Sequence, residues 1–262
     1  AKGVSVGDQV AVFPWIGCGI CEMCMTGMEN LCPAPKNLGV NLNGGFSTHV
    51  MVPNSKYLFL IGEQPSELAA TYACSGLTAY SSLKKISDRA NGNQLLIIGA
   101  GGVGLAGVMI AQAIMETEII VADIDPIKRE VAIQAGAKYA IDPNDTQARK
   151  QVVKLSGGGV PAAIDFVGSA ETVKFGFETL RALGQLVVVG LFGGAVNLSV
   201  PMFPLKNLSI VGSYVGSLTE MEELMKIVSE NKVKPIPLMI RPLNNASETL
   251  EDLANGKIVG RV

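Results

Sequence analysis

The chain has 262 residues, of which 48% are hydrophobic and 17% charged, and its formal net charge is −2. This length suits one large or two modest domains, and the mixed charge without a basic block argues against nucleic-acid binding. The first residues lack the charged and then apolar pattern of a secretion signal, so we expect a cytoplasmic protein. Five glycines interrupt the uncharged run 95–111, which favours a strand turning into a helix over a membrane span.

Four of the five cysteines, Cys18, Cys21, Cys24 and Cys32, lie within fifteen residues, in a segment with almost no strand or helix pattern. Four thiolates this close can surround one tetrahedral ion, and a closed shell of four sulfurs leaves no position for a substrate. We therefore predict a structural zinc in a lobe at residues 17–33. Two alternatives stay open: disulfides, which a reducing cytosol disfavours, and an iron–sulfur cluster, for which this spacing with a later Cys-Pro is also typical.

The apolar run 94–98 predicts a buried parallel strand, and a G-x-G-x-x-G segment from Gly99 to Gly104 follows it directly. A helical pattern then continues to about residue 115. In this setting Gly99 permits the tight turn, Gly101 lets the backbone approach a pyrophosphate, and Gly104 lets the helix pack on the strand. The pyrophosphate would face the helix N-terminus at Gly102 and Val103. The pattern predicts a dinucleotide-binding Rossmann domain.

The next apolar run, 118–122, ends in Asp123, nineteen residues after Gly104. An acid at this distance can bind both ribose hydroxyls of the adenosine and repels a 2′-phosphate, so it favours NAD over NADP. Lys128 is a second candidate for a ribose contact. The alternative for Asp123 is a turn or cap residue, but Asp125 before Pro126 already suits the N-cap of the next helix.

Strand-like runs continue at 139–141, 163–166, 186–189 and 208–214, with helical stretches between several of them. Ser169 and Gly184 are the expected start and stop of one such helix. Six strands predict an α/β fold with a doubly wound parallel sheet. The nicotinamide should lie at the switch point, beyond strand ends such as Val189, Gly190 and Leu191, which places the chemistry near residues 167–192.

Taken together, the sequence resembles the medium-chain zinc-dependent alcohol dehydrogenases, especially their tetrameric bacterial and archaeal members. The segments that carry the resemblance are, in order, VGDQVAV, PWIGCGICEMCMTGMENLC, GGFSTHVMVP, ACSGLTAYSSL, IIGAGGVG, VADID, VVVGLFGG, IVGSYVGS and NGKIVGRV. The resemblance implies a partial β-rich, GroES-like catalytic domain with the zinc lobe at 1–80, the NAD-binding Rossmann domain at 81–216, and a return to the catalytic domain at 217–262. It also implies hydride transfer between a primary or secondary alcohol and NAD.

The resemblance further implies roles for single residues. The cysteine cluster would hold the structural zinc, and Cys74 would be one of three protein ligands of a catalytic zinc, which acts as a Lewis acid on the alcohol. Thr78 matches a residue near the cofactor, Arg261 one that contacts the pyrophosphate, and Trp15 a wall of the substrate pocket. The alternatives are a buried thiol for Cys74, a core tryptophan for Trp15 and a solvated terminal charge for Arg261.

The family's other two catalytic-zinc ligands, a cysteine and a histidine, precede the point where this sequence begins. The single histidine, His49, lies in the strand-like FSTHVMVP, and we interpret it as a surface or strand residue rather than a ligand. We therefore expect a sequence shortened at both ends, with little turnover by itself.

Val196 to Val200 resembles the edge strand through which family members pair, which predicts a homodimer or homotetramer. The expected partners are a small alcohol and its aldehyde or ketone, with neither nucleic acid nor membrane. The alternatives are a polyol or amino-alcohol dehydrogenase of the same superfamily and a non-catalytic fragment that binds NAD and zinc.

Overall fold

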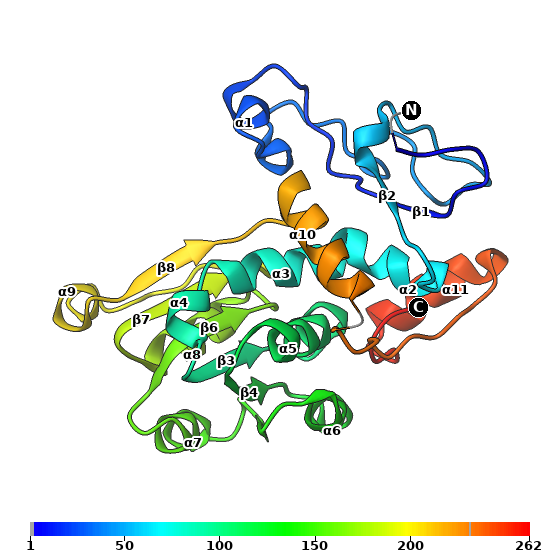
Figure 1. The fold of residues 1–262 in the computed structure, drawn as a ribbon. Helices are drawn as coiled ribbons and strands as arrows, with labels where there is room; N and C mark the ends of the chain where they lie inside the picture. The colour runs from blue at the N-terminus through cyan, green and yellow to red at the C-terminus, as the bar shows by residue number, and fades with distance from the viewer. Residues whose placement is uncertain (1–2, 231) are drawn as a thin grey trace. The chain divides into compact units, whose positions relative to one another are not determined.

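The computed structural model describes residues 3–230 and 232–262. The contacts within the chain form two compact units (Figure 1). Unit 1 comprises Ala1–Ser81 and Tyr214–Val262, and unit 2 comprises Ser82–Ser213.

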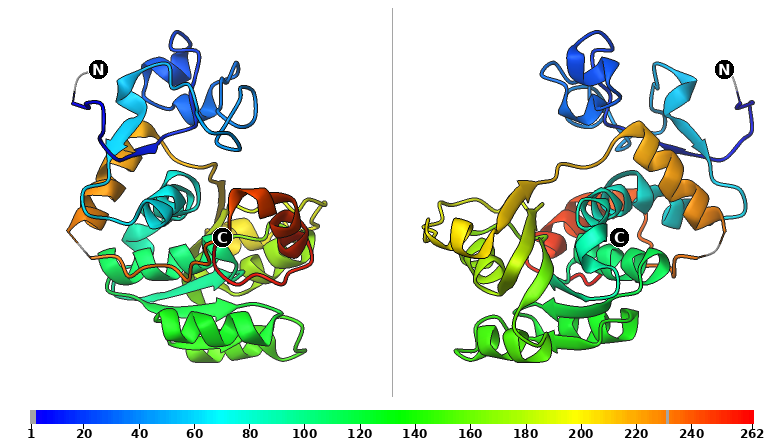
Figure 2. Two further views of the ribbon diagram at one scale, coloured as in Figure 1. Left: turned by 90° about the vertical axis from the view of Figure 1, so that its right-hand side faces the viewer. Right: turned by 60° about the vertical axis from the view of Figure 1, so that its left-hand side comes forward.

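Unit 2 is built on a six-stranded sheet with the order β5-β4-β3-β6-β7-β8, in which every neighbouring pair is parallel. β7 and β8 lie beside each other at one edge of the sheet (Figures 1 and 2). The order reverses between β3 and β6, as in a doubly wound fold, so the predicted α/β class is confirmed. The strands are β3 (Gln94–Ile98), β4 (Glu118–Ala122), β5 (Tyr139–Ile141), β6 (Val160–Asp165), β7 (Leu180–Val188) and β8 (Ser209–Gly212).

The central strands are apolar throughout because helices cover both faces of the sheet. Leu96 and Ile98 pack with Val152 and Phe177, which come from α7 and α8 on one face. On the other face, a Cβ added to Gly107 of α5 would lie 3.7 Å from the side chain of Ile97. The helices of unit 2 are α4 (Ser87–Ala90), α5 (Gly102–Ile114), α6 (Pro126–Ala135), α7 (Ala148–Leu155), α8 (Ala170–Glu178) and α9 (Met202–Lys206).

The bounds of β6, β7 and β8 differ from the expected ranges 163–166, 186–189 and 208–214, and two further details differ as well. The helix that begins after Ser169 ends at Glu178, not at Gly184, because the chain from Leu180 onward already pairs with β6. Gly184 lies inside β7, where an added Cβ would come within 2.9 Å of the Arg181 carbonyl oxygen. The expected strand at 196–200 is also not formed, since an edge strand needs a hydrogen-bonded neighbour and no described segment pairs with it.

Unit 1 contains less β structure than the expected β-rich domain: its described strands are β1 (Val10–Val12) and β2 (Leu58–Leu60), which pair antiparallel. Residues 46–53 form no strand, so the strand-like reading of this segment is wrong, and His49 lies exposed on a loop. The remaining elements are α1 (Glu22–Met25), η1 (Glu29–Leu31), η2 (Ser55–Tyr57), α2 (Ser66–Thr71), η3 (Tyr72–Gly76), α3 (Leu77–Lys84, which continues into unit 2), α10 (Leu218–Ser229), η4 (Leu243–Asn245) and α11 (Ala246–Ala254).

The apolar run 95–111 folds as most of β3, the glycine turn and the first part of α5. Among the described residues, no helix combines the length and apolar character that crossing a membrane requires.

Candidate cofactor and metal sites

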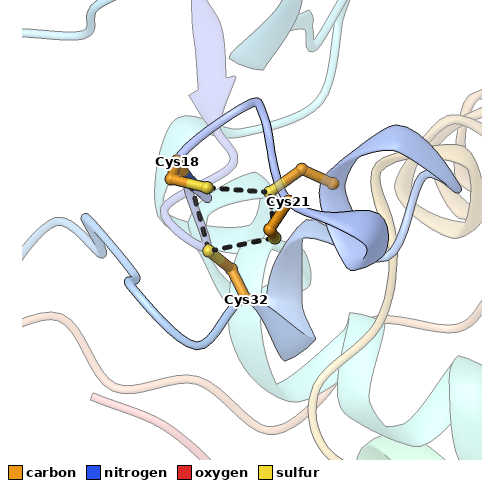
Figure 3. A group of neighbouring side chains, drawn as sticks. Cys18, Cys21 and Cys32 are labelled. Carbon is orange, nitrogen blue, oxygen red and sulfur yellow. Dashed lines mark hydrogen bonds between the residues drawn. The ribbon is translucent and has the colours of Figure 1, made fainter.

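The four clustered cysteines point their sulfurs at one centre. The Sγ atoms of Cys21 and Cys24 are 3.5 Å apart, those of Cys21 and Cys32 are 3.7 Å apart, and those of Cys18 and Cys24 are 4.0 Å apart. Figure 3 shows three of these side chains converging. Four sulfurs at Zn–S distances of about 2.3 Å would be separated by roughly 3.8 Å in a tetrahedron. The cluster therefore fits one zinc ion, and it is far too open for disulfides, whose S–S bond is about 2.05 Å.

Backbone N–H groups donate hydrogen bonds to the sulfurs of this site. The amide of Cys18 donates to Cys32 Sγ at 3.2 Å, and the amide of Ala34 donates to the same sulfur at 3.3 Å. Backbone N–H groups of Ile20 and Cys21 lower the pKa of Cys18 to about 6, which favours the thiolate that a metal binds, whereas burial raises the pKa of Cys24 to about 12. A Cβ added at Gly17 would lie 2.4 Å from Cys24 Sγ, so this position requires glycine.

The glycines of the turn after β3 have different surroundings: two are closely packed, and one has open space beside it. Gly99 has a φ of +90°, and a Cβ on Gly104 would lie 1.8 Å from the Gly99 carbonyl oxygen. At Gly101, by contrast, an added Cβ would meet no described atom within 4 Å. Helix α5 starts at Gly102 without a side-chain cap, so the first N–H groups of the helix remain available to an anion.

Asp123, directly after β4, has the turn role that was considered as its alternative, and it keeps free acceptor sites. One carboxylate oxygen accepts from the Ala100 amide at 2.6 Å, and the other accepts from the Asp125 amide at 2.9 Å, as in a turn. Asp125 caps α6 through the Ile127 amide at 2.8 Å. Because each carboxylate oxygen has two acceptor sites, Asp123 keeps capacity for ligand hydroxyls. Lys128 forms an ion pair with Asp125, with Nζ 3.8 Å from that carboxylate.

A cavity of about 340 Å³ opens at the carboxyl ends of β3 and β4. Gly99 and Asp123 form part of its wall, together with Asn144, Thr172 and Phe192. A cavity of this size and largely apolar lining is typical of a site for a flat organic ring, with the carboxylate at its mouth available to hydroxyl groups.

Sequence reasoning did not identify Asp165, the last residue of β6. Its side chain is completely buried and accepts three hydrogen bonds: from the amides of Val167 (2.8 Å) and Gly168 (3.0 Å) and from Thr172 Oγ1 (2.7 Å). Burial raises the pKa of this carboxyl group, and the three donors oppose that shift. The only signal in the sequence is an acid that ends an apolar run two residues before a Val-Gly pair.

Asp165 also joins the loops after β6 and β7. Its carbonyl oxygen accepts from the amides of Val189 (2.9 Å) and Gly190 (3.0 Å). Next to it the two loops touch backbone to backbone, since a Cβ on Gly168 would lie 1.9 Å from the Gly190 oxygen. The residue after them, Leu191, is exposed. The expected nicotinamide region is thus built on Asp165.

In unit 1, three expected site residues gather around one irregular turn. Cys74 lies in the π-helical segment Tyr72–Gly76, a type of turn that is frequent at functional sites. Trp15 Nε1 donates to the carbonyl of Ala73 at 3.1 Å, and Arg261 Nε donates to Ser75 Oγ at 3.2 Å. Arg261 is therefore anchored, and Trp15 lies at this turn with its ring edge-on to Tyr214.

Cys74 is exposed in the described structure. The protein atoms around the thiol nevertheless desolvate it enough to raise its pKa, against the opposing effect of the Arg261 charge. Thr78 Oγ1 donates to the Cys74 carbonyl at 2.8 Å within the helix. Within the described chain, the four clustered cysteines are the only group of three or more residues placed to share a metal ion. The described residues therefore supply only Cys74 for a catalytic zinc and do not complete such a site.

Comparison with known families agrees with this architecture. Residues 1–62 match the alcohol dehydrogenase GroES-like domain, and residues 102–230 match the zinc-binding dehydrogenase domain. An NAD-dependent alcohol dehydrogenase of Sulfurisphaera tokodaii is 35% identical over 99% of this chain and 75% of its own length. The chain belongs to the medium-chain zinc-dependent alcohol dehydrogenase family. The sequence-based assignment to this family of oxidoreductases is confirmed.

Solved structures of the family have the same fold. The alcohol dehydrogenase of Aeropyrum pernix is 29% identical, with a TM-score of 0.90 over 99% of this chain and 76% of that one. The D-arabinose dehydrogenase of Sulfolobus solfataricus, also 29% identical, has a TM-score of 0.86 over 92% of this chain and 76% of that one. The family therefore includes proteins with different named substrates on one scaffold.

We expect Asp165→Ala to lower the free energy of unfolding by about 2–4 kcal/mol, because two buried amides and a hydroxyl lose their acceptor. Asp165→Asn keeps an acceptor for the amides and can exchange a hydrogen bond with Thr172, so its loss should be about 1 kcal/mol. Urea denaturation followed by circular dichroism measures both. Equal losses for the two variants would show that the acceptor geometry at the switch point is not what stabilises the unit.

Proposed function

We propose that this protein is an NAD-dependent oxidoreductase that transfers hydride between an alcohol and NAD, yielding an aldehyde or ketone. The observation that carries the proposal is the uncapped N-terminus of α5 after an open Gly101, together with a cavity that Gly99 and Asp123 line. A helix N-terminus attracts the pyrophosphate, and the acid accepts from the ribose.

The proposed cofactor site assigns each part of NAD to described residues. The adenosine ribose binds Asp123, with Lys128 as a second contact, and the pyrophosphate lies at Gly101, Gly102 and Val103. The nicotinamide lies beyond Val189, Gly190 and Leu191, where Asp165 fixes the backbone. Thr78 and Arg261 are proposed as further cofactor contacts on the family's pattern alone.

We further propose that Cys18, Cys21, Cys24 and Cys32 hold one structural zinc, which stabilises the fold of the lobe and takes no part in the reaction. Thiolates in such a site suit the reducing cytoplasm. Cys74 and Trp15 are proposed for the reacting side, as a zinc ligand and a pocket wall. We derive no step through a catalytic zinc, because the described residues supply only Cys74 for it.

A second candidate substrate class follows from the D-arabinose dehydrogenase neighbour, which favours a sugar or polyol. A third possibility is a module that binds NAD and zinc without turnover. We also propose a homodimer or homotetramer, which the exposed apolar side chains of Leu191, Phe192 and Val200 support.

NAD binding is tested by a pair of glycine variants. Gly101→Ala should leave the melting temperature nearly unchanged, because an added Cβ meets no described atom, while NAD affinity falls about tenfold or more as the methyl group occupies the pyrophosphate side. Gly104→Ala should instead destabilise unit 2, since its Cβ collides with the Gly99 oxygen. Calorimetric NAD titration and thermal melting measure these effects. Unchanged NAD affinity in Gly101→Ala would refute the proposed pyrophosphate site.

Metal analysis should find one zinc per chain and no broad visible absorption, which an iron–sulfur cluster would produce. Cys32→Ser should lose most of this zinc, because three thiolates and a hydroxyl bind it far less tightly. Cys74→Ser, outside the cluster, is the matched control and should retain one zinc. Two zinc ions per chain in the unmodified protein, falling to one in Cys74→Ser, would instead establish a second metal site.

The substrate classes are separated by following NADH formation with ethanol, benzyl alcohol and D-arabinose. We expect little turnover by this chain, because its described residues complete no catalytic metal site. Robust oxidation of either alcohol would contradict that expectation and favour the alcohol class. Faster oxidation of D-arabinose would favour the second candidate.

A further inference from the structure

A carboxylate lies buried inside the cysteine lobe. The side chain of Glu29 is only 6% exposed, and both of its carboxylate oxygens have hydrogen-bond partners. Oε2 accepts from the Gly17 amide at 3.1 Å and from the Tyr57 hydroxyl at 2.6 Å, and Oε1 accepts from Lys56 Nζ at 2.5 Å. A buried charge is retained only when it is paired and hydrogen-bonded in this way.

The partners of Glu29 lie at both ends of the cysteine loop. Gly17 directly precedes Cys18, the first thiolate in the chain. Glu29 itself opens the short helix η1, and its carbonyl accepts from the amide of Cys32, the last thiolate, at 3.1 Å. Glu29 therefore bonds to the backbone at both ends of the loop. Its side chain accepts from Gly17, next to Cys18, and its carbonyl accepts from Cys32.

The same carboxylate connects the loop to the paired strands of unit 1. Lys56 and Tyr57 belong to η2, which leads into β2. The Tyr57 carbonyl accepts from the Phe13 amide at 2.8 Å, and the Tyr57 and Phe13 rings are stacked with centroids 6.1 Å apart. The aromatic pair gives the carboxylate a rigid support, so displacement of Glu29 would release the loop from that support.

Lys56 places a positive charge against this buried carboxylate. Four thiolates around a divalent zinc carry a net charge of −2, and a nearby buried carboxylate adds to the repulsion. The Lys56 ammonium, half-exposed on its outer side, is the one cation that an ion pair joins to Glu29 among the described residues. It offsets the carboxylate charge beside the thiolates.

We propose that Glu29 is a positioning residue for the structural zinc: it holds the two ends of the cysteine loop at the spacing of a tetrahedral site and so slows zinc loss. The inference rests on the proposed zinc binding and is independent of NAD binding. The loop must open before its thiolates separate from the zinc. Weakening the hydrogen bonds of Glu29 should therefore speed zinc release without changing which four side chains bind the zinc.

The test compares zinc release from Glu29→Gln and Glu22→Gln, measured with an excess of a chromogenic chelator on the purified zinc-loaded protein. Both substitutions remove one negative charge from the lobe, but Glu22 is exposed. We expect release about tenfold or more faster in Glu29→Gln and within about twofold of the unmodified protein in Glu22→Gln. In cobalt-substituted protein, the thiolate-to-cobalt absorption of Glu29→Gln should shift, which a general loss of stability would not cause.

Tyr57→Phe removes one donor and keeps the stacked ring, so it provides the measurement if Glu29→Gln does not fold. Its release rate should rise about threefold. Equal release rates in the unmodified protein and in the folded variants, with one zinc bound to each, would overturn the positioning role while leaving the zinc site intact. An unmodified protein without zinc would instead refute the proposed zinc binding itself.

Discussion

Backbone lying directly against backbone is the constraint on which the carboxyl edge of the sheet depends. A Cβ at Gly104 would come within 1.8 Å of the Gly99 oxygen, and one at Gly168 within 1.9 Å of the Gly190 oxygen. These contacts seat α5 against β3 and join the loops after β6 and β7. The rest of the proposed NAD site follows from them, because they leave the helix N-terminus and the neighbouring cavity open at the point where the strand order reverses.

Two aspartates lie at the carboxyl edge of the sheet, Asp123 directly after β4 and Asp165 at the end of β6. Their roles differ. Asp123 follows β4 and faces the cavity, and spacing from the glycine turn was sufficient to predict it. Asp165 ends β6 and is completely buried. Its side chain bonds within its own loop, to Val167, Gly168 and Thr172, and only its carbonyl oxygen reaches the loop after β7. Its importance was not predicted, because an acid at the end of an apolar run does not reveal that it will be buried. Spacing from a motif suggests a role for an acid, whereas burial and the pairing of distant strands are not visible in a local sequence pattern.

The same distinction explains how much of the fold was predictable. The ranges expected for β3, β4 and β5 match the structure residue for residue, because short apolar runs bounded by glycine or acid residues leave little ambiguity. The predicted end of α8 was wrong. Gly184 has the local character of a helix stop, but pairing with β6 makes this residue part of β7. In the cysteine lobe, spacing predicted the four thiolates, but not Glu29, whose partner Tyr57 is 28 residues away.

A departure from regular helical structure supports the proposed role of Cys74 in unit 1. The cysteine cluster fills its own coordination shell, so no substrate can bind there. Cys74 is exposed, in a π-helical turn that gives up regular α-helical hydrogen bonds, and Trp15 and Arg261 each bond to a residue next to it. A fold retains such an irregularity when its function requires it, since a regular α-helix would be the more stable local choice. These contacts support the proposal that the turn at Cys74, and not the cysteine cluster, lies on the reacting side.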